Sequence, residues 1–242
     1  PKTGKRIAKG NSYHEHILKA KQWKNATQGY LASINYADDL TGKVLSALAK
    51  SEYADNTIVV VFSDHGWQLG EKEHWQKHAL WENVIKSVLM IKTPEQILNG
   101  ETNIKKGSKC FKNVSLVDVF PTLAELCGLP DKEGVTGKSL LPLLNNLEDK
   151  LWNNTAITVL GKNHYSVRKD QWHYILYNDV EEELYNVEQD PEEWVNLAEN
   201  PQYETLISQL KKSIPNKKTR KPLVKTKPIR WEDVLSGETQ FY

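Results

Sequence analysis

The side chains best suited to chemistry lie in one segment, NTIVVVFSDHGWQLGEKEHWQKHALW, which runs from residue 56 to 81. A β-branched and apolar run, Thr57 to Phe62, is followed almost at once by Asp64, His65 and Gly66. A carboxylate at a strand end is costly to desolvate unless a cation or hydrogen-bond donors meet it. An adjacent imidazole adds a metal ligand or a proton-transfer group, and the glycine permits close backbone approach. The tripeptide is a candidate metal or acid–base site, and a solvated polar strand end is the alternative.

Two further residues in the following turn, His74 and Lys77, strengthen this candidate site. A lysine beside a bound anion stabilises the charge on a transferring sulfuryl or phosphoryl group. His74 could donate to the same anion or protonate the leaving group. Each residue alone is typical of a solvated loop, but their position just after the Asp-His pair favours a shared anion site. His78 lacks such support and is expected to be structural.

The elements that must position these residues can be read from periodicity. The run Thr57 to Phe62 predicts a strand covered on both faces, as in the parallel sheets of α/β proteins, whose ligands bind beyond the carboxyl ends of the strands. Apolar residues at helical spacing predict a long amphipathic helix over residues 23–48. The run SVLMI predicts a second strand at 87–91, and residues 114–127 predict a helix that ends at Gly128.

Beyond residue 150 the pattern changes to short alternating runs at 156–160, 165–168, 172–177 and 183–187. They predict a small antiparallel sheet, with a helix over residues 201–214 covering one face. We therefore expect an α/β portion over residues 1–148, beginning with a loop at 1–12, and an α+β subdomain over 149–242. His164, Arg168, Trp172 and His173 could line the mouth of a pocket and choose a ligand, or be ordinary residues of that sheet.

Composition limits the function classes. The 242 residues are 39% hydrophobic and 26% charged, with a net charge of +1, so no global field points to nucleic acid. No apolar run is long enough to predict a transmembrane segment. The basic stretch at 211–227 predicts a solvated tail, with a polyanion-binding patch as the alternative. Cys110 and Cys127 lack metal-ligand spacing and could form a disulfide or be buried free thiols.

The segment SDHGWQLGEKEHWQKHALWEN resembles the metal-and-sulfate loop of the type I sulfatases, in the alkaline phosphatase superfamily, and in particular the iduronate-2-sulfatase-like and bacterial polysaccharide sulfatase subgroup. Further motifs resemble the family in the same order: WKNATQGYLASINYADDLTGKVLSAL, VSLVDVFPTLAELCGLP, GKSLLPLL and EELYNVEQDPEEWVNLAENP. The resemblance implies an α/β fold, the C-terminal part of an alkaline-phosphatase-like three-layer domain, followed by a small α+β subdomain with an antiparallel sheet.

The resemblance also assigns roles to residues. Asp64 corresponds to a carboxylate ligand of one divalent cation, usually Ca²⁺, and His65 to a residue that binds the metal or the sulfate. Lys77 matches the lysine that grips the sulfate oxygens, with His74 three residues before it. Trp67 stands where a ring could form a wall of the substrate pocket.

The nucleophile motif of the family, Cys- or Ser-x-Pro-Ser-Arg, occurs at neither Cys110 nor Cys127. Formylglycine is therefore expected on an N-terminal part of the same enzyme, which would be the partner of this chain. The opening PKTGKRIAKG likewise looks like the middle of a longer protein. The sequence thus predicts the C-terminal portion of a sulfatase, incomplete alone, that acts on a sulfated sugar or polysaccharide in a secreted, periplasmic or lysosomal setting. The alternatives are a metal-dependent phosphodiesterase or phosphomutase of the same superfamily, or a non-catalytic carbohydrate-binding relic.

Overall fold

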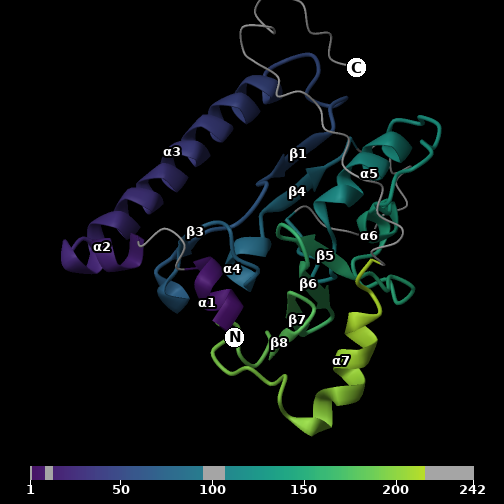
Figure 1. Cartoon of the computed structure of the whole chain (residues 1–242). Helices are drawn as coiled ribbons and strands as arrows, with labels where there is room; N and C mark the ends of the chain where they lie inside the picture. Colours follow the sequence, from purple (N-terminus) through teal and green to yellow (C-terminus); the bar gives the residue numbers. More distant parts are fainter. Residues whose placement is uncertain (1, 9–12, 95–106, 216–242) are drawn as a thin grey trace, which may run out of the picture.

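The computed structural model describes residues 2–8, 13–94 and 107–215 (Figure 1). Its N-terminal half begins with helices α1 (Lys2–Ala8), α2 (Tyr13–Lys19) and α3 (Trp23–Ala49). The long helix α3 confirms the helix predicted over residues 23–48. The loop predicted for residues 1–12 is wrong where it is described, because residues 2–8 are helical. Thr3 in α1 donates its backbone N–H to Glu181 at 2.8 Å, so a contact distant in sequence stabilises this helix.

Strands β1 (Val59–Phe62) and β4 (Leu89–Lys92) confirm the two strands predicted in this half, but they pair antiparallel, with Val60 opposite Ile91. The expectation of a parallel sheet is therefore wrong for this pair. A parallel pair needs a crossover connection, usually a helix, whereas the chain between β1 and β4 forms a small hairpin and one four-residue helix. Strand β1 is also only half-buried among the described residues, and Phe62 at its end is 54% exposed.

The connection between β1 and β4 carries the candidate site. It contains strands β2 (Gln68–Leu69) and β3 (Trp75–Gln76), the 3-10 turn η1 (Glu71–Glu73) and helix α4 (Glu82–Ile85). Two aromatic contacts hold this hairpin against α3: Trp23 packs edge-on to Trp75, and Tyr30 stacks on Trp67 at a centroid distance of 5.7 Å. The long helix thus supports the loop that follows the first strand.

The predicted helix at 114–127 is present in two pieces, the 3-10 turn η3 (Leu116–Asp118) and helix α5 (Val119–Leu126). A capping box between Ser115 and Asp118 starts it. Gly128, with φ of 64°, follows its end as predicted. A short helix, α6 (Leu141–Asn145), packs nearby.

The C-terminal sheet is an antiparallel meander in the order β5 (Ala156–Val159), β6 (His164–Lys169), β7 (Trp172–Tyr177) and β8 (Glu181–Asn186), as predicted. One apolar cluster, which includes Tyr174 and Leu184, packs the sheet against η4 (Pro201–Tyr203) and α7 (Glu204–Lys211). A second cluster joins Leu80 and Trp81, from the loop before β4, to Ile175 and Tyr185 of the sheet. The candidate site and the C-terminal sheet therefore share a core, and the division at residue 148 stays a prediction.

Both cysteines are free and exposed, so neither the disulfide nor the buried thiols expected from the sequence is found. No helix in the described part of the chain is long and apolar enough to cross a membrane. Of the predicted basic tail, residues 216–227 lie outside the described part of the chain.

Candidate functional site

Asp64 and His65 lie just beyond the end of β1, as the sequence predicts. The Asp64 side chain is 77% exposed, and its Oδ2 lies 3.4 Å from Nε2 of His65. The other ring nitrogen of His65, Nδ1, lies 2.8 Å from the carbonyl oxygen of Gly66. Because a carbonyl only accepts hydrogen bonds, Nδ1 is the donor in this contact, and Nε2 is the ring nitrogen that lies on the side of Asp64.

The carboxylate of this pair is an oxygen donor of the kind that a hard divalent cation prefers, and the spacing of the two side chains allows both to contact one ion. Two ligands at right angles, each about 2.4 Å from a Ca²⁺ ion, are about 3.4 Å apart, which is the separation of Asp64 Oδ2 and His65 Nε2. A backbone carbonyl that fixes the far side of a histidine ring is the usual support of a metal-bound imidazole. Calcium takes six to eight ligands, so these two residues alone could not complete a calcium site.

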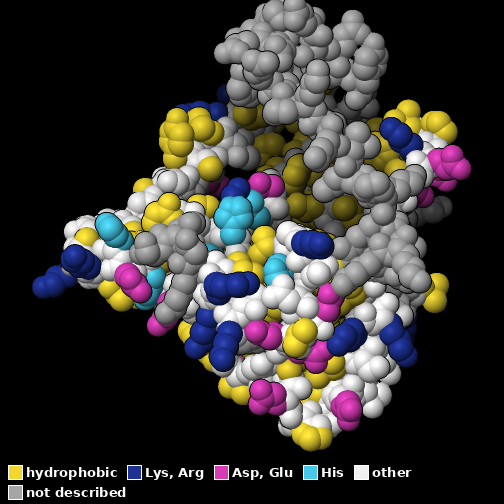
Figure 2. Space-filling view, in the orientation of Figure 1, with side chains coloured by type: hydrophobic (Ala, Val, Ile, Leu, Met, Phe, Trp, Pro, Cys, Tyr) yellow, Lys and Arg dark blue, Asp and Glu magenta, His cyan; other side chains and the backbone are white. Residues whose placement is uncertain are grey.

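Lys77 lies on the rim of the same cavity as Asp64 and His65. The cavity has a volume of about 880 Å³ and is lined by these three residues, by His78 and by residues of α4, the 110–116 segment, β5 and the turns of the C-terminal sheet. Figure 2 shows His, Lys or Arg, and acidic side chains gathered beside an apolar hollow on this face of the molecule. His78, expected from the sequence to be structural, lies among the lining residues.

The backbone around Lys77 is unusual. Its two neighbours, Gln76 and His78, have φ of 77° and 73°, and Lys72 and Glu73 have φ of 53° and 60°. Residues other than glycine adopt this left-handed conformation at a cost of about 1–3 kcal/mol each, and only where surrounding contacts impose it. Such positions cluster at functional sites.

The other two predicted residues, His74 and Trp67, support the loop rather than line the cavity. His74 is only 4% exposed, and its Nε2 lies 2.9 Å from the carbonyl oxygen of Lys77, to which it donates. The ring of Trp67 stacks on those of Tyr30 and His65. His74 therefore contacts the backbone of Lys77, and Trp67 stacks on the histidine of the candidate metal pair.

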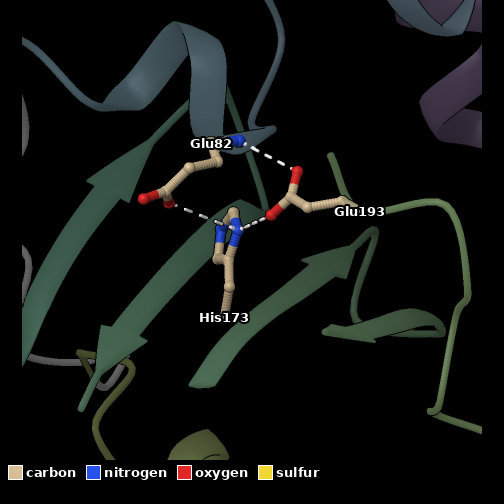
Figure 3. A group of neighbouring side chains, drawn as sticks. All are labelled: Glu82, His173 and Glu193. Atoms are coloured by element: carbon tan, nitrogen blue, oxygen red, sulfur yellow. Dashed lines mark hydrogen bonds and ion pairs between the residues drawn. The ribbon is translucent and has the colours of Figure 1, made fainter. Parts of the chain in front are cut away.

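A second cluster of titratable side chains, Glu82, His173 and Glu193, lies buried between α4 and the C-terminal sheet (Figure 3). Their potential ligand atoms lie within 4.8 Å of one another. Those atoms are already paired, because the Glu193 carboxylate bonds to His173 Nδ1 and accepts the backbone N–H of Glu82 at 2.9 Å. Nε2 of His173 bonds to Ser166, and Glu82 accepts from Nε of Arg168 at 2.8 Å.

The guanidinium of Arg168 beside Glu82 opposes a second cation, so we read this cluster as a structural link rather than a metal centre. Its members are far apart in sequence: Glu82 and Glu193 fall inside two different quoted motifs and His173 in neither, so spacing could not have revealed the cluster. Of the four residues considered for a pocket mouth, Arg168 lines the cavity and His173 is fully buried. His164 and Trp172 pack on Tyr177 and Tyr203, away from the cavity lining.

Comparisons with known proteins identify the family. The Sulfatase family model matches residues 4–129, and the model described as N-sulphoglucosamine sulphohydrolase, C-terminal, matches residues 70–220. A sulfatase of Formosa agariphila is 40% identical over 201 residues, covering 83% of this chain and 38% of that protein. Arylsulfatase K of Canis lupus familiaris is 31% identical over 211 residues, covering 81% of this chain and 38% of that protein. The chain belongs to the sulfatase family.

A solved structure is also similar to most of this chain. The structure of BT4656 in complex with its substrate D-glucosamine-2-N,6-O-disulfate matches with a TM-score of 0.70 and 28% identity, over 81% of this chain and 40% of that one. The match confirms the predicted fold class, that of the alkaline-phosphatase-like sulfatases. The chain spans about two fifths of the length of the relatives it matches.

Proposed function

We propose that this chain supplies part of the active site of a sulfuric ester hydrolase that acts on a sulfated sugar or polysaccharide. The observation that carries the proposal is the shared cavity, which Asp64, His65 and Lys77 line together. The membership of the sulfatase family, and the sulfated glucosamine bound by the similar structure, support a sulfated sugar as the ligand.

In this proposal Asp64 would hold one Ca²⁺ ion through Oδ2, and His65, whose Nε2 lies 3.4 Å away, would bind the ion or the sulfate. When bound, the ion supplies positive charge beside the reacting sulfate group. Lys77 binds the sulfate oxygens through its ammonium group and stabilises the negative charge that develops on them. His74 donates to the backbone carbonyl of Lys77 and so orients the lysine, and Trp67 stacks on His65 and limits the orientation of its ring.

The nucleophile motif of the family, Cys- or Ser-x-Pro-Ser-Arg, does not occur in this sequence. We propose that a formylglycine on an N-terminal part of the same enzyme faces the cavity, and that the complete protein works in a secreted, periplasmic or lysosomal setting. Determining the sequence that precedes Pro1 tests this step. A Cys- or Ser-x-Pro-Ser-Arg motif there supports the enzyme, and its absence favours a non-catalytic carbohydrate-binding protein.

Sulfate release by the complete protein from a panel of sulfated monosaccharides tests the assignment of Lys77. Lys77→Ala is expected to lower kcat by about a hundredfold or more, as loss of one charge-stabilising donor does. Lys162→Ala, at an exposed position between β5 and β6 that does not line the cavity, is the control and should leave the rate unchanged. Equal sulfate release by Lys77→Ala and the wild type would show that Lys77 does not bind the reacting group.

A further inference from the structure

The loop around Lys77 contains several residues with a left-handed backbone, a conformation that surrounding contacts must hold in place. Glu193, in the C-terminal part of the chain, provides two of these contacts. Lys72 and Glu82 lie five residues before and five residues after Lys77. The Lys72 ammonium donates to the backbone carbonyl of Glu193, and the backbone N–H of Glu82 donates to the Glu193 carboxylate at 2.9 Å. A single residue therefore bonds to both ends of the loop that carries Lys77.

Lys72 is held by more than this hydrogen bond. Its ammonium lies 5.2 Å from the ring centroid of Trp81, 4.9 Å from that of Tyr185 and 5.6 Å from that of Trp194. Cation–π contacts at these distances are attractive, and more strongly so where the cation is desolvated. Burial lowers the pKa of Lys72, while Glu193 and Glu183 oppose that shift.

The residues that contact Lys72 and Glu82 are themselves held in place by further hydrogen bonds. Glu193 is 1% exposed, and its carboxylate also bonds to His173 of β7. Trp81 donates its Nε1–H to Glu183 of β8 at 2.8 Å, and Tyr185 donates its hydroxyl to the same carboxylate oxygen at 2.9 Å. Hydrogen bonds to β7 and β8 therefore hold the residues that contact Lys72 and Glu82, although Glu193 itself lies in the segment after β8.

We propose that Lys72 and Glu193 form a two-point clamp, here called the Glu193 clamp, which positions Lys77 in the cavity. The inference rests on the proposed function, because it assigns positioning residues to the proposed sulfate-binding lysine. Lys72 and Glu193 do not line the cavity, so they act through Lys77 rather than on the substrate. Small errors in the placement of such a group can cost up to about a hundredfold in rate.

A double-mutant cycle in the complete protein tests the clamp. Lys72→Met keeps the apolar stem between the rings and removes the charge and the donor, and we expect it to lower kcat by about tenfold or more. Lys72→Arg keeps the charge and the donor and is expected to have most of the wild-type rate. Lys162→Met is the matched control and should leave the rate unchanged. In a Lys77→Ala background, Lys72→Met should change kcat less than twofold, because the residue that it positions is gone. The same fractional loss in both backgrounds would overturn the clamp.

Hydrogen exchange separates failure of the clamp from failure of the proposed function. The amides of Gly70 and His74 donate to carbonyls within the loop, to His74 and to Glu71. Lys72→Met should raise their exchange rates about tenfold or more and leave the amides of β7 unchanged. Unchanged exchange of both loop amides would refute the clamp whatever the activity. If the loop amides exchange faster while Lys77→Ala retains full activity, the clamp exists but the role proposed for Lys77 is wrong.

Discussion

Replacing Arg168 by methionine is expected to destabilise the protein by about 3 kcal/mol. Arg168 Nε donates to Glu82 Oε2 at 2.8 Å, and the two side chains are only 15% and 11% exposed. Removing one partner of a buried ion pair costs about 3–5 kcal/mol, because the remaining charge is left unpaired. We expect the lower end of this range, since both side chains retain some contact with solvent. The guanidinium also donates to the carbonyls of Asp170 and Trp172, at 3.0 and 2.9 Å, and those acceptors lose their donor.

An exposed ion pair of the same length provides the control. Lys43 and Asp39 on α3 are 2.7 Å apart, with side chains 69% and 55% exposed. Lys43→Met should change the free energy of unfolding by no more than about 0.5 kcal/mol, as exposed pairs do. In a Glu82→Gln background the buried charge is absent, so Arg168→Met should cost only about 1 kcal/mol, from the lost hydrogen bonds.

Thermal unfolding followed by tryptophan fluorescence measures these differences. For a protein of this size about 1 kcal/mol shifts Tm by about 2–4 °C, so Arg168→Met should lower Tm by about 6–12 °C. A shift no larger than that of Lys43→Met, or an equal shift in the Glu82→Gln background, would refute the argument that the unpaired buried charge is the cause.

Three further predictions concern packing, pH and metal. A Cβ at Gly66 would lie 2.1 Å from the backbone oxygen of Asn83, so Gly66→Ala should destabilise the protein, whereas Gly29→Ala, with open space on a helix, should stabilise it by about 1 kcal/mol in urea unfolding. Burial raises the pKa of Tyr174 above its ordinary 10.0, so the folded protein keeps a proton that the unfolded chain loses. Stability should therefore fall as pH rises above about 10, and Tyr174→Phe should flatten that decline in the free energy of unfolding. Chelation should lower sulfate release by the complete protein, Ca²⁺ should restore it, and Asp64→Asn should weaken Ca²⁺ binding measured by calorimetry.

The parts of the fold that the sequence predicts are those set by local patterns. Apolar residues that recur at helical spacing predict α3, alternating runs predict β6 and β7, and Gly128 predicts the end of α5. The parts that it misses depend on distant contacts. Helix α1 has a glycine and no apolar stripe, and it is stabilised by Thr3 against Glu181. The antiparallel pairing of β1 depends on the path of the chain back to β4, which a single strand does not encode.

In the candidate site, too, the sequence predicts the residues that lie close together in the chain and misses the contacts between distant ones. Asp64, His65 and Lys77 were predicted from one contiguous segment, and the structure brings them to one cavity. The buried pairing of Glu82 with Arg168 and of Glu193 with His173 was not predicted, because partners 86 and 20 residues apart leave no local signal. His74 was predicted for its chemistry, and only the coordinates show that its ring turns to the backbone of Lys77.

The central claim is that Asp64, His65 and Lys77 together bind a metal ion and the sulfate of the substrate. A crystal structure of the complete protein with Ca²⁺ and a sulfated monosaccharide tests it most directly. The account predicts a cation bound by Asp64 Oδ2, His65 Nε2 in contact with the cation or the sulfate, and a sulfate oxygen within hydrogen-bond distance of Lys77 Nζ. A sulfate group bound elsewhere, with Asp64 and Lys77 in contact only with solvent, would contradict it.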